Sequence, residues 1–118
     1  FNDSYEVDDA SGESNWTPEF FVEFQKFQGY DLKEYLPALL GLDTSEMNSR
    51  VLYDYRMTIS ELLLDKYTKN WQQWAARQGK GIRNQAHGSP ANVLDLYAAS
   101  DVPEIEGNDI VNSLNLFL

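Results

Sequence analysis

Residues 81–107 limit the possible folds of this chain more than any other stretch, because two short apolar segments flank a turn and a helix start there. Residues 82–86 are predicted to form a strand. Ser89 is then expected to cap a helix, with Pro90 as its first residue. Residues 102–106 predict a second strand, although the helix is short for a crossover. The stretch is therefore expected to form a strand-helix-strand unit.

Polar side chains lie at the ends of both predicted strands, where such a unit gathers its functional residues. Gln85 and His87 come at the end of the first strand, and Glu104 and Glu106 lie in the second. Because the carboxyl ends of parallel strands meet at one edge of a sheet, we expect these side chains to share one crevice. His87 is the single histidine of the chain. A lone histidine after a strand is more often structural than functional, but for His87 we weigh the two interpretations about equally.

A run of phenylalanines predicts an amphipathic helix near the N-terminus. Thr17 and Pro18 form its expected start and Gly29 its end. Asp31 is expected to cap a second helix, which Pro37 should make irregular. We interpret the aromatic stripe as core rather than as a cofactor site. The side chains expected to face inward in these two helices are Phe20, Phe21, Phe24, Phe27, Tyr35, Leu36, Leu39 and Leu40.

The longest predicted element begins after Thr44 or Ser45 and extends to Gln78, with Gly79 directly after it. Its apolar residues keep a helical period over many turns: Leu52, Tyr55, Ile59, Leu62, Leu63, Tyr67, Trp71 and Trp74. Burial of this stripe would contribute about 1.5–3 kcal/mol for each large side chain. The charged residues in the first half of the helix are interpreted as a surface set: Arg50, Asp54 and Arg56.

The charge balance excludes several classes of partner. The 118 residues contain 19 Asp and Glu but 9 Lys and Arg, which gives a formal net charge of -10 at pH 7. Without clustered basic residues the chain is not expected to bind nucleic acid or a membrane surface. It has no apolar run near the ~20 residues that cross a bilayer, and no secretory signal pattern. The absence of cysteine excludes disulfides, a thiol nucleophile and a thiolate zinc site.

Both ends of the chain fall within patterned sequence. Residues 1–7 alternate large and polar side chains, which predicts a short strand, and Asn108 is expected to cap a last helix through Phe117. Residues 8–15 are interpreted as a solvated acidic loop, because their spacing does not match a calcium-binding EF-hand loop. Since apolar patterning reaches both ends, we expect the chain to be a fragment of a larger domain.

Several motifs occur in an order typical of one enzyme family. They are Asp3-Ser4-Tyr5-Glu6-Val7, Asn15-Trp16-Thr17-Pro18-Glu19-Phe20, Gly29-Tyr30-Asp31-Leu32, Tyr35-Leu36-Pro37, residues 50–56, Asn84-Gln85-Ala86-His87-Gly88-Ser89-Pro90 and Asp101-Val102-Pro103-Glu104-Ile105-Glu106. With these motifs the chain resembles the catalytic domain of family 106 glycoside hydrolases, the α-L-rhamnosidases. Several motifs in one order are more specific than any one alone.

The resemblance implies an α/β fold: a partial (β/α)₈ barrel, helix-rich with two or three short strands, whose active site lies at the carboxyl ends of the strands. A whole barrel takes roughly 250 residues, so residues 1–118 would be a fragment of the catalytic domain. The resemblance further implies cleavage of terminal α-linked L-rhamnose with inversion, in oligo- or polysaccharides, helped by a calcium ion that binds sugar hydroxyls. By the same analogy the protein is expected to be secreted or periplasmic.

The resemblance also implies roles for individual residues. Glu6 matches the glutamate of the Asp-Ser-Tyr-Glu motif and is expected to be the general acid, with its pKa raised by the nearby charge of Asp3. Glu106 is the candidate second carboxylate, Glu104 is its close competitor, and a glutamate beyond Leu118 could hold the base role instead. Gln85 and His87 would hydrogen-bond sugar hydroxyls. The expected substrate-binding residues are Asp3, Gln85, His87 and Glu104.

A second interpretation stays open from the residues alone. The aromatic stripes could bind a partner helix, which would make the chain a non-catalytic, helix-rich interaction module. As an isolated piece the chain is not expected to catalyse in either case, because three strands cannot close a barrel. Its exposed strand edges would instead favour self-association.

Overall fold

The computed structural model describes residues 1–5, 16–42 and 46–105. The chain forms two compact units. Residues 8–63 form the helical unit, and residues 1–7 together with residues 64–118 form the strand unit. Helices dominate the described residues and two short strands accompany them, as predicted. The predicted loop at 8–15 and the predicted helix from Asn108 lie outside the described residues.

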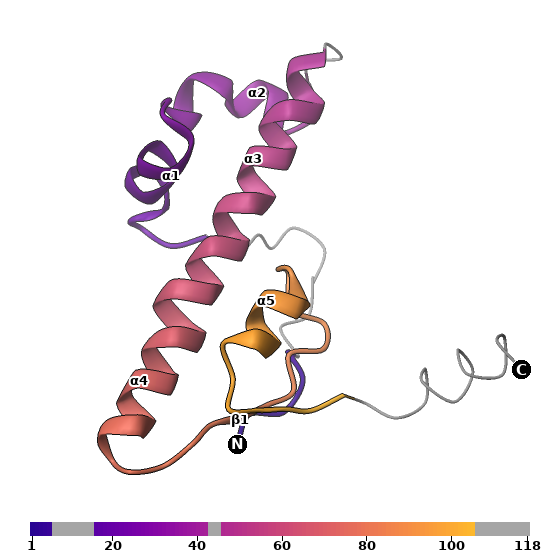
Figure 1. The fold of residues 1–118 in the computed structure, drawn as a ribbon. Coiled ribbons are helices and arrows are strands. Elements are labelled where there is room, and N and C mark those ends of the chain that lie inside the picture. The colour runs from indigo at the N-terminus through magenta and orange to yellow at the C-terminus, as the bar shows by residue number, and fades with distance from the viewer. Residues whose placement is uncertain (6–15, 43–45, 106–118) are drawn as a thin grey trace, which may run out of the picture. The chain divides into compact units, whose positions relative to one another are not determined.

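In the helical unit, α1 and α2 lie beside α3 (Figure 1). The elements in chain order are α1 (Phe20–Gln28), a 3₁₀ helix (Leu32–Tyr35), α2 (Leu36–Leu39) and α3 (Glu46–Leu62). Gly29 ends α1 with a φ of 83°, a conformation that glycine adopts without strain. The side chain of Asp31 accepts the amide of Lys33 and so caps the 3₁₀ helix. Three predictions are therefore confirmed: Gly29 ends the first helix, Asp31 caps the second, and the helical segment around Pro37 is irregular.

Side chains from all four elements meet in the core of the helical unit: Phe20, Phe24, Leu32, Ala38, Val51 and Ile59. The Phe24 ring meets the Tyr30 ring edge-on, with centroids 5.0 Å apart. The predicted inward position was wrong for Phe27 and Leu40, which are 41% and 70% exposed. Phe27 lies in the last turn of α1. Leu40 follows the end of α2, where the helical spacing no longer applies.

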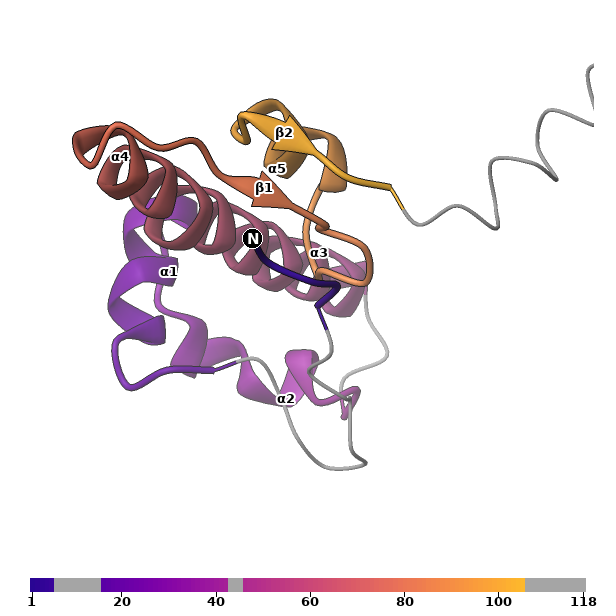
Figure 2. The same cartoon turned by 90° about the horizontal axis from the view of Figure 1, so that it is seen from below.

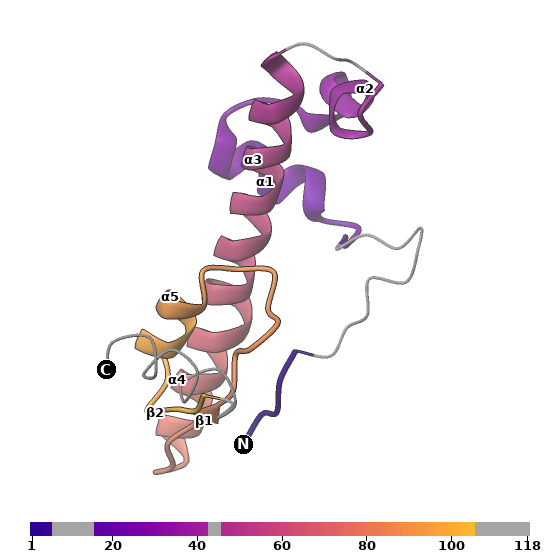
Figure 3. The same cartoon turned by 90° about the vertical axis from the view of Figure 1, so that its right-hand side faces the viewer.

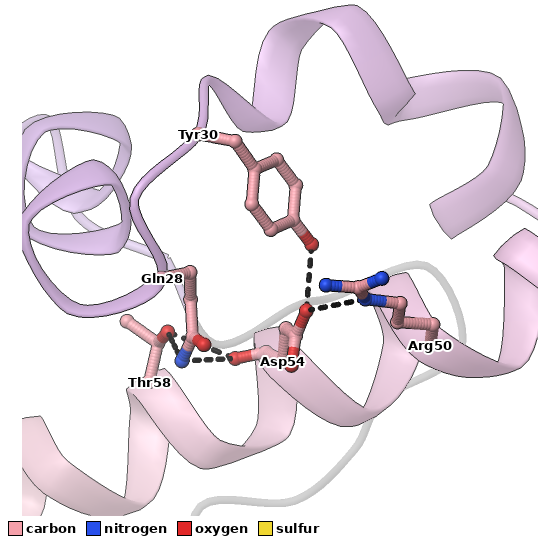
Figure 4. A network of polar contacts seen from close by, with 5 residues as sticks. All are labelled: Gln28, Tyr30, Arg50, Asp54 and Thr58. Carbon is pink, nitrogen blue, oxygen red and sulfur yellow. Dashed lines mark hydrogen bonds and ion pairs between the residues drawn. The ribbon is translucent and has the colours of Figure 1, made fainter.

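A hydrogen-bond network joins the end of α1 to α3 (Figure 4). Gln28 Nε2 donates to the Asp54 carbonyl oxygen at 3.2 Å and to Thr58 Oγ1 at 3.1 Å. The Tyr30 hydroxyl donates to Asp54 Oδ2 at 2.9 Å, and Arg50 Nε lies 3.9 Å from the same oxygen. Burial and the hydrogen bond to Asp54 raise the pKa of Tyr30 to about 12. Asp54 is therefore an internal acceptor as well as a member of the predicted charge set.

A π-helix (Leu63–Thr68) begins at the last residue of the helical unit, and α4 (Lys69–Arg77) follows it in the strand unit. Gly79 follows α4 with a φ of 66°, as predicted. The prediction of a buried stripe was wrong for Tyr67 and Trp74, which are 47% and 56% exposed, whereas Thr68 and Ala75 are buried. A π turn closes over more residues than an α turn, so it changes the phase of the side chains that follow. The apolar stripe of α3 therefore does not continue unchanged along α4.

Two short parallel strands and one helix complete the strand unit. They are β1 (Arg83–Asn84), α5 (Val93–Ala98) and β2 (Val102–Pro103). Figure 2 shows the two strands side by side, and Figure 3 shows the crossover through α5. The predicted strand-helix-strand order is confirmed, with shorter strands.

The predicted cap of the crossover helix was wrong. Asn92 caps α5, because its side chain accepts the amide of Leu94 at 3.1 Å. Ser89 and Pro90 instead belong to a tight turn, in which Ala91 N donates to the Ser89 carbonyl oxygen at 2.8 Å. Within the ranges that the structure describes, none of the helices has the length and apolarity of a membrane span.

Candidate functional site

The N-terminal segment, β1 and β2 form three parallel backbone segments in chain order (Figure 2). Asn2 exchanges two hydrogen bonds of 3.0 Å with the backbone of Arg83 and Gln85. Two more, of 2.9 and 3.0 Å, run from the amides of Val102 and Glu104 to carbonyl oxygens of the middle segment. Sequential parallel segments of this kind place their carboxyl ends at one edge of the sheet.

The register of these segments places three predicted site residues side by side. The pairing joins Asn2 to Asn84 and Asn84 to Pro103. The next residues along the three segments are Asp3, Gln85 and Glu104. Three polar side chains from distant parts of the sequence therefore occupy neighbouring positions across the sheet.

Alternation of side chains shows which face these residues share. In the middle segment, Ile82, Asn84 and Ala86 are buried, whereas the residues between and after them are not: Arg83, Gln85 and His87. Successive side chains of a strand point to opposite faces, so the predicted site residues lie on the face that is not buried. We call this the open face; it carries Asp3, Arg83, Gln85, His87 and Glu104.

The buried side of the same sheet is held by Asn84, which is 2% exposed. Its Oδ1 accepts a hydrogen bond from Asn2 Nδ2 at 3.1 Å, and its Nδ2 donates to Ser100 Oγ at 3.3 Å. Ser100 Oγ in turn donates to the Leu96 carbonyl oxygen of α5 at 2.8 Å. One buried amide therefore connects the N-terminal segment, β1 and the residues that lead into β2, and leaves its own polar atoms paired.

An ion pair crosses the open face between β1 and β2. Arg83 donates from Nε and Nη2 to the two carboxylate oxygens of Glu104. The guanidinium also lies over the ring of Phe1, 5.1 Å from its centroid. The hydrogen bond from Arg83 lowers the pKa of Glu104, so this carboxyl is held in its ionised form. Such a group accepts hydrogen bonds from a ligand but does not donate a proton.

The turn after β1 brings His87 next to the N-terminal segment. Tyr5 N donates to the His87 carbonyl oxygen at 2.8 Å. Gly88 follows with a φ of 77°, and a Cβ atom there would lie 2.9 Å from the Tyr5 carbonyl oxygen. The backbone of His87 is thus fixed beside Tyr5, the residue directly before Glu6.

Comparison with known proteins shows the family of the chain. The sequence model of glycoside hydrolase family 106, described as alpha-L-rhamnosidase, matches residues 1–106. The chain belongs to this family. The predicted resemblance to family 106 is confirmed, and the match contains every predicted site residue.

The chain is similar to two proteins from other organisms. A protein of Formosa agariphila described as "Putative beta-glucuronidase" is 32% identical over 102 residues, which are 85% of this chain and 8% of that protein. The structure of a rhamnosidase from Novosphingobium sp. PP1Y is similar with a TM-score of 0.68 and 31% identity, over 84% of this chain and 10% of that one. The chain thus spans a tenth or less of the length of either relative.

The family 106 chain brings four predicted site residues to the open face: Asp3, Gln85, His87 and Glu104. Asp3 Oδ1 accepts the amide of Ser4 at 2.9 Å, and the Glu104 carboxylate is bonded to Arg83. Glu6 and Glu106, the predicted catalytic pair, lie outside the described residues, so their roles stay predictions.

Sequence reasoning missed Arg83 and Asn84 as residues that shape the site. A signal for Asn84 was present, because it lies between Ile82 and Ala86 at the period of a buried strand face. No local signal marks the pairing of Arg83, because its partner Glu104 lies 21 residues further along the chain. The ion pair becomes visible only when the two strands are placed side by side.

The calcium ion that the family resemblance implies stays a prediction. Within residues 1–5, 16–42 and 46–105, no group of three or more His, Cys, Asp or Glu side chains could hold a metal ion. The chemistry of the open face is derived without a calcium ion.

Proposed function

We propose that the protein containing this chain hydrolyses terminal α-L-rhamnosides, and that the chain forms part of its (β/α)₈ catalytic barrel. The family match and the likeness to a rhamnosidase structure support this class of enzyme. The observation that best supports the proposal is the open face. Its polar side chains lie at the carboxyl ends of three neighbouring parallel segments, and (β/α)₈ barrels have their active sites at the carboxyl ends of their strands. The family match also favours a hydrolase over a helical interaction module.

The proposed reaction is inverting and uses two carboxyl groups about 6.5–9.5 Å apart. Glu6 protonates the glycosidic oxygen as the bond to the anomeric carbon breaks. Glu106 takes a proton from the water that attacks this carbon from the opposite side. In the sequence, Glu6 directly follows the N-terminal segment and Glu106 comes three residues after β2.

Glu104 suits substrate binding better than proton transfer. A general base works best when its pKa lies near the operating pH, because it must bind the proton that it removes. The ion pair with Arg83 lowers the pKa of Glu104 and so makes its carboxylate a weaker base. This favours Glu106 as the base over Glu104, which remains able to accept hydrogen bonds from sugar hydroxyls.

The charge of the open face favours a neutral sugar. A glucuronide, which the name of the Formosa agariphila relative brings into consideration, carries a carboxylate that needs a free cation. Arg83 already uses two of its nitrogens on Glu104. Rhamnose has no charge to balance, so an α-L-rhamnoside fits the described part of this face better than a glucuronide.

The test is a kinetic comparison in the full-length protein. We expect hydrolysis of p-nitrophenyl α-L-rhamnoside and not of p-nitrophenyl β-glucuronide. Glu6→Gln and Glu106→Gln should each lower kcat/KM for a poor alkyl leaving group by about 10²–10⁴-fold. The loss of kcat/KM in Glu6→Gln should be much smaller for a substrate with an activated aryl leaving group, because such a group departs without protonation. Glu46→Gln, at an exposed glutamate of α3, serves as the control and should behave as wild type.

Two further readouts separate the parts of this proposal. Proton NMR of the first product should show inversion at the anomeric carbon. Glu104→Gln should raise KM more than it lowers kcat, since the residue binds substrate in the ground state as well. The 118-residue chain alone should be inactive, because three segments cannot close a barrel. Wild-type activity in both Glu6→Gln and Glu106→Gln would overturn the assignment of the catalytic pair.

A further inference from the structure

The side chains of Arg83 and Glu104 meet across two paired strands, β1 and β2 (Figure 2). The register pairs Arg83 with Val102 and Asn84 with Pro103, and Glu104 directly follows β2. The backbone of Glu104 is held as well, because its amide donates to the Asn84 carbonyl oxygen at 3.0 Å. Both side chains therefore start from positions that the pairing of two neighbouring strands fixes, and their contact needs no other segment of the protein.

Two parallel hydrogen bonds connect these side chains. Nε and Nη2 of Arg83 donate to different oxygens of the Glu104 carboxylate, with 2.9 Å between Nη2 and Oε1. Such a pair of bonds fixes the plane of the carboxylate as well as its position, which one bond does not do. An ionised carboxylate offers about four lone-pair sites, so roughly two of them stay available to other donors.

The helix α5 shows which side of the sheet this pair occupies. Asn84 is buried and connects through Ser100 to the Leu96 carbonyl oxygen of α5, whereas Arg83 lies on the opposite, open face. In a (β/α)₈ barrel the helices cover the outer surface, so the other side of each strand lines the interior. Glu104 comes just past the end of its strand, at the level where these barrels bind substrate. In the barrel proposed above, further strands would therefore leave this carboxylate beside the substrate.

We propose that Arg83 is a positioning residue: it orients the Glu104 carboxylate so that the remaining lone pairs accept hydrogen bonds from hydroxyl groups of the terminal sugar. Arg83 acts through Glu104 and does not bind the sugar itself. The inference rests on the proposed hydrolysis of α-L-rhamnosides and deepens it, because it assigns substrate binding to a pair of residues on two strands. A carboxylate that is already held in one orientation binds more tightly, since the substrate does not have to order it.

The test is a double-mutant cycle in the full-length protein, with p-nitrophenyl α-L-rhamnoside as the substrate. Arg83→Gln and Glu104→Gln should each raise KM about tenfold and change kcat less than about threefold. In the Glu104→Gln background, Arg83→Gln should change KM by less than about twofold, because the group that Arg83 orients is already lost. Arg83→Lys keeps the charge but not the two parallel bonds, so its KM should lie between those of wild type and Arg83→Gln.

The matched control is Arg77→Gln, at an exposed arginine of α4 in the same unit, and it should keep the wild-type KM. Circular dichroism and thermal denaturation of each variant separate an effect on binding from an effect on folding. Losses that multiply in the double variant, a wild-type KM in Arg83→Gln, or an equal rise of KM in Arg77→Gln would each overturn this inference alone. A wild-type protein that does not hydrolyse the rhamnoside would overturn the proposed function together with it.

Discussion

At the scale of single residues, Gly88 is the glycine, among those that the structure describes, where an added side chain would meet the closest contact. Its φ is 77°, and an added Cβ would meet the Tyr5 carbonyl oxygen at 2.9 Å. Gly79 has a similar φ of 66° but nothing within 4 Å of its Cβ position. The two glycines therefore separate the cost of the backbone conformation from the cost of the close approach.

We expect Gly88→Ala to lower the free energy of unfolding by about 2–4 kcal/mol and Gly79→Ala by about 1 kcal/mol. Urea denaturation followed by circular dichroism measures both. Equal losses in the two variants would mean that the contact with Tyr5 adds nothing to the strain at Gly88.

Tyr30 gives the helical unit a pH-dependent contribution at alkaline pH. Its hydroxyl pKa rises from 10.0 to about 12, through burial first and the bond to Asp54 second. The folded state holds this proton more tightly than the unfolded state, so the contribution is complete below pH 10 and is lost as pH rises towards 12. We expect the free energy of unfolding to fall across this range, and to fall less steeply in Tyr30→Phe.

The control for this experiment is Tyr53→Phe, because Tyr53 is 63% exposed. Urea denaturation at a series of pH values on either side of 10.0 gives the slopes, and the control should follow wild type. If Tyr30→Phe and wild type lose stability at the same rate, the pKa of Tyr30 does not differ between the folded and unfolded states.

At the scale of elements, two buried threonines in helices allow the effect of a buried hydroxyl on the free energy of unfolding to be compared. Thr58 in α3 donates to the Asp54 carbonyl oxygen at 2.8 Å and accepts from Gln28. Thr68 ends the π-helix, is 1% exposed, and its Oγ1 has no hydrogen-bond partner among the described residues. A buried polar atom without a partner costs free energy, whereas a paired one does not.

The substitution to valine keeps the shape of threonine and removes the hydroxyl. Thr58→Val should lower the free energy of unfolding by about 1–2 kcal/mol, and Thr68→Val should leave it unchanged or raise it by up to about 1 kcal/mol. Thermal and urea denaturation of both variants provide the comparison. A loss in Thr68→Val as large as that in Thr58→Val would show that the Thr68 hydroxyl is paired.

At the scale of the whole molecule, the charge balance sets how the chain behaves in solution. The formal net charge of -10 at pH 7 keeps molecules apart, and the sequence isoelectric point near 4.3 marks where this repulsion ends. We expect reversible self-association as the pH falls from 7 towards 4.3. The strand edges that have no partner among the described residues, and the exposed aromatic rings, are then no longer opposed by charge.

Light scattering across this pH range measures the association, and circular dichroism separates it from unfolding. Hydrogen bonds from the Ile82 amide and from Arg83 lower the pKa of Asp101 and Glu104 respectively. Their contributions are complete above the ordinary carboxyl pKa and are lost only as pH falls through the lowered values. Scattering should therefore rise before the helical signal falls; unfolding that comes first would contradict this order.

Patterns over a few neighbouring residues were sufficient to predict many of the secondary-structure elements and the family. The phenylalanine stripe predicts α1, Gly29 and Gly79 mark helix ends, and residues 81–107 predict the strand-helix-strand order. The exposure of Tyr67 and Trp74 was not predictable in this way. It depends on a π-helix, whose wider turn changes which side chains face inward, and no residue type in that segment marks it.

The candidate site also has a part that the sequence predicted and a part that only the structure shows. Residue types near the strand ends pointed to Gln85 and His87, and local spacing was enough for this because each strand places its own polar residues at its carboxyl end. The open face itself required the assembled fold, since Asn2 and Asn84 are 82 residues apart and Arg83 and Glu104 are 21 apart. Contacts over such distances depend on how segments pair in space, and they leave no period in the sequence between them.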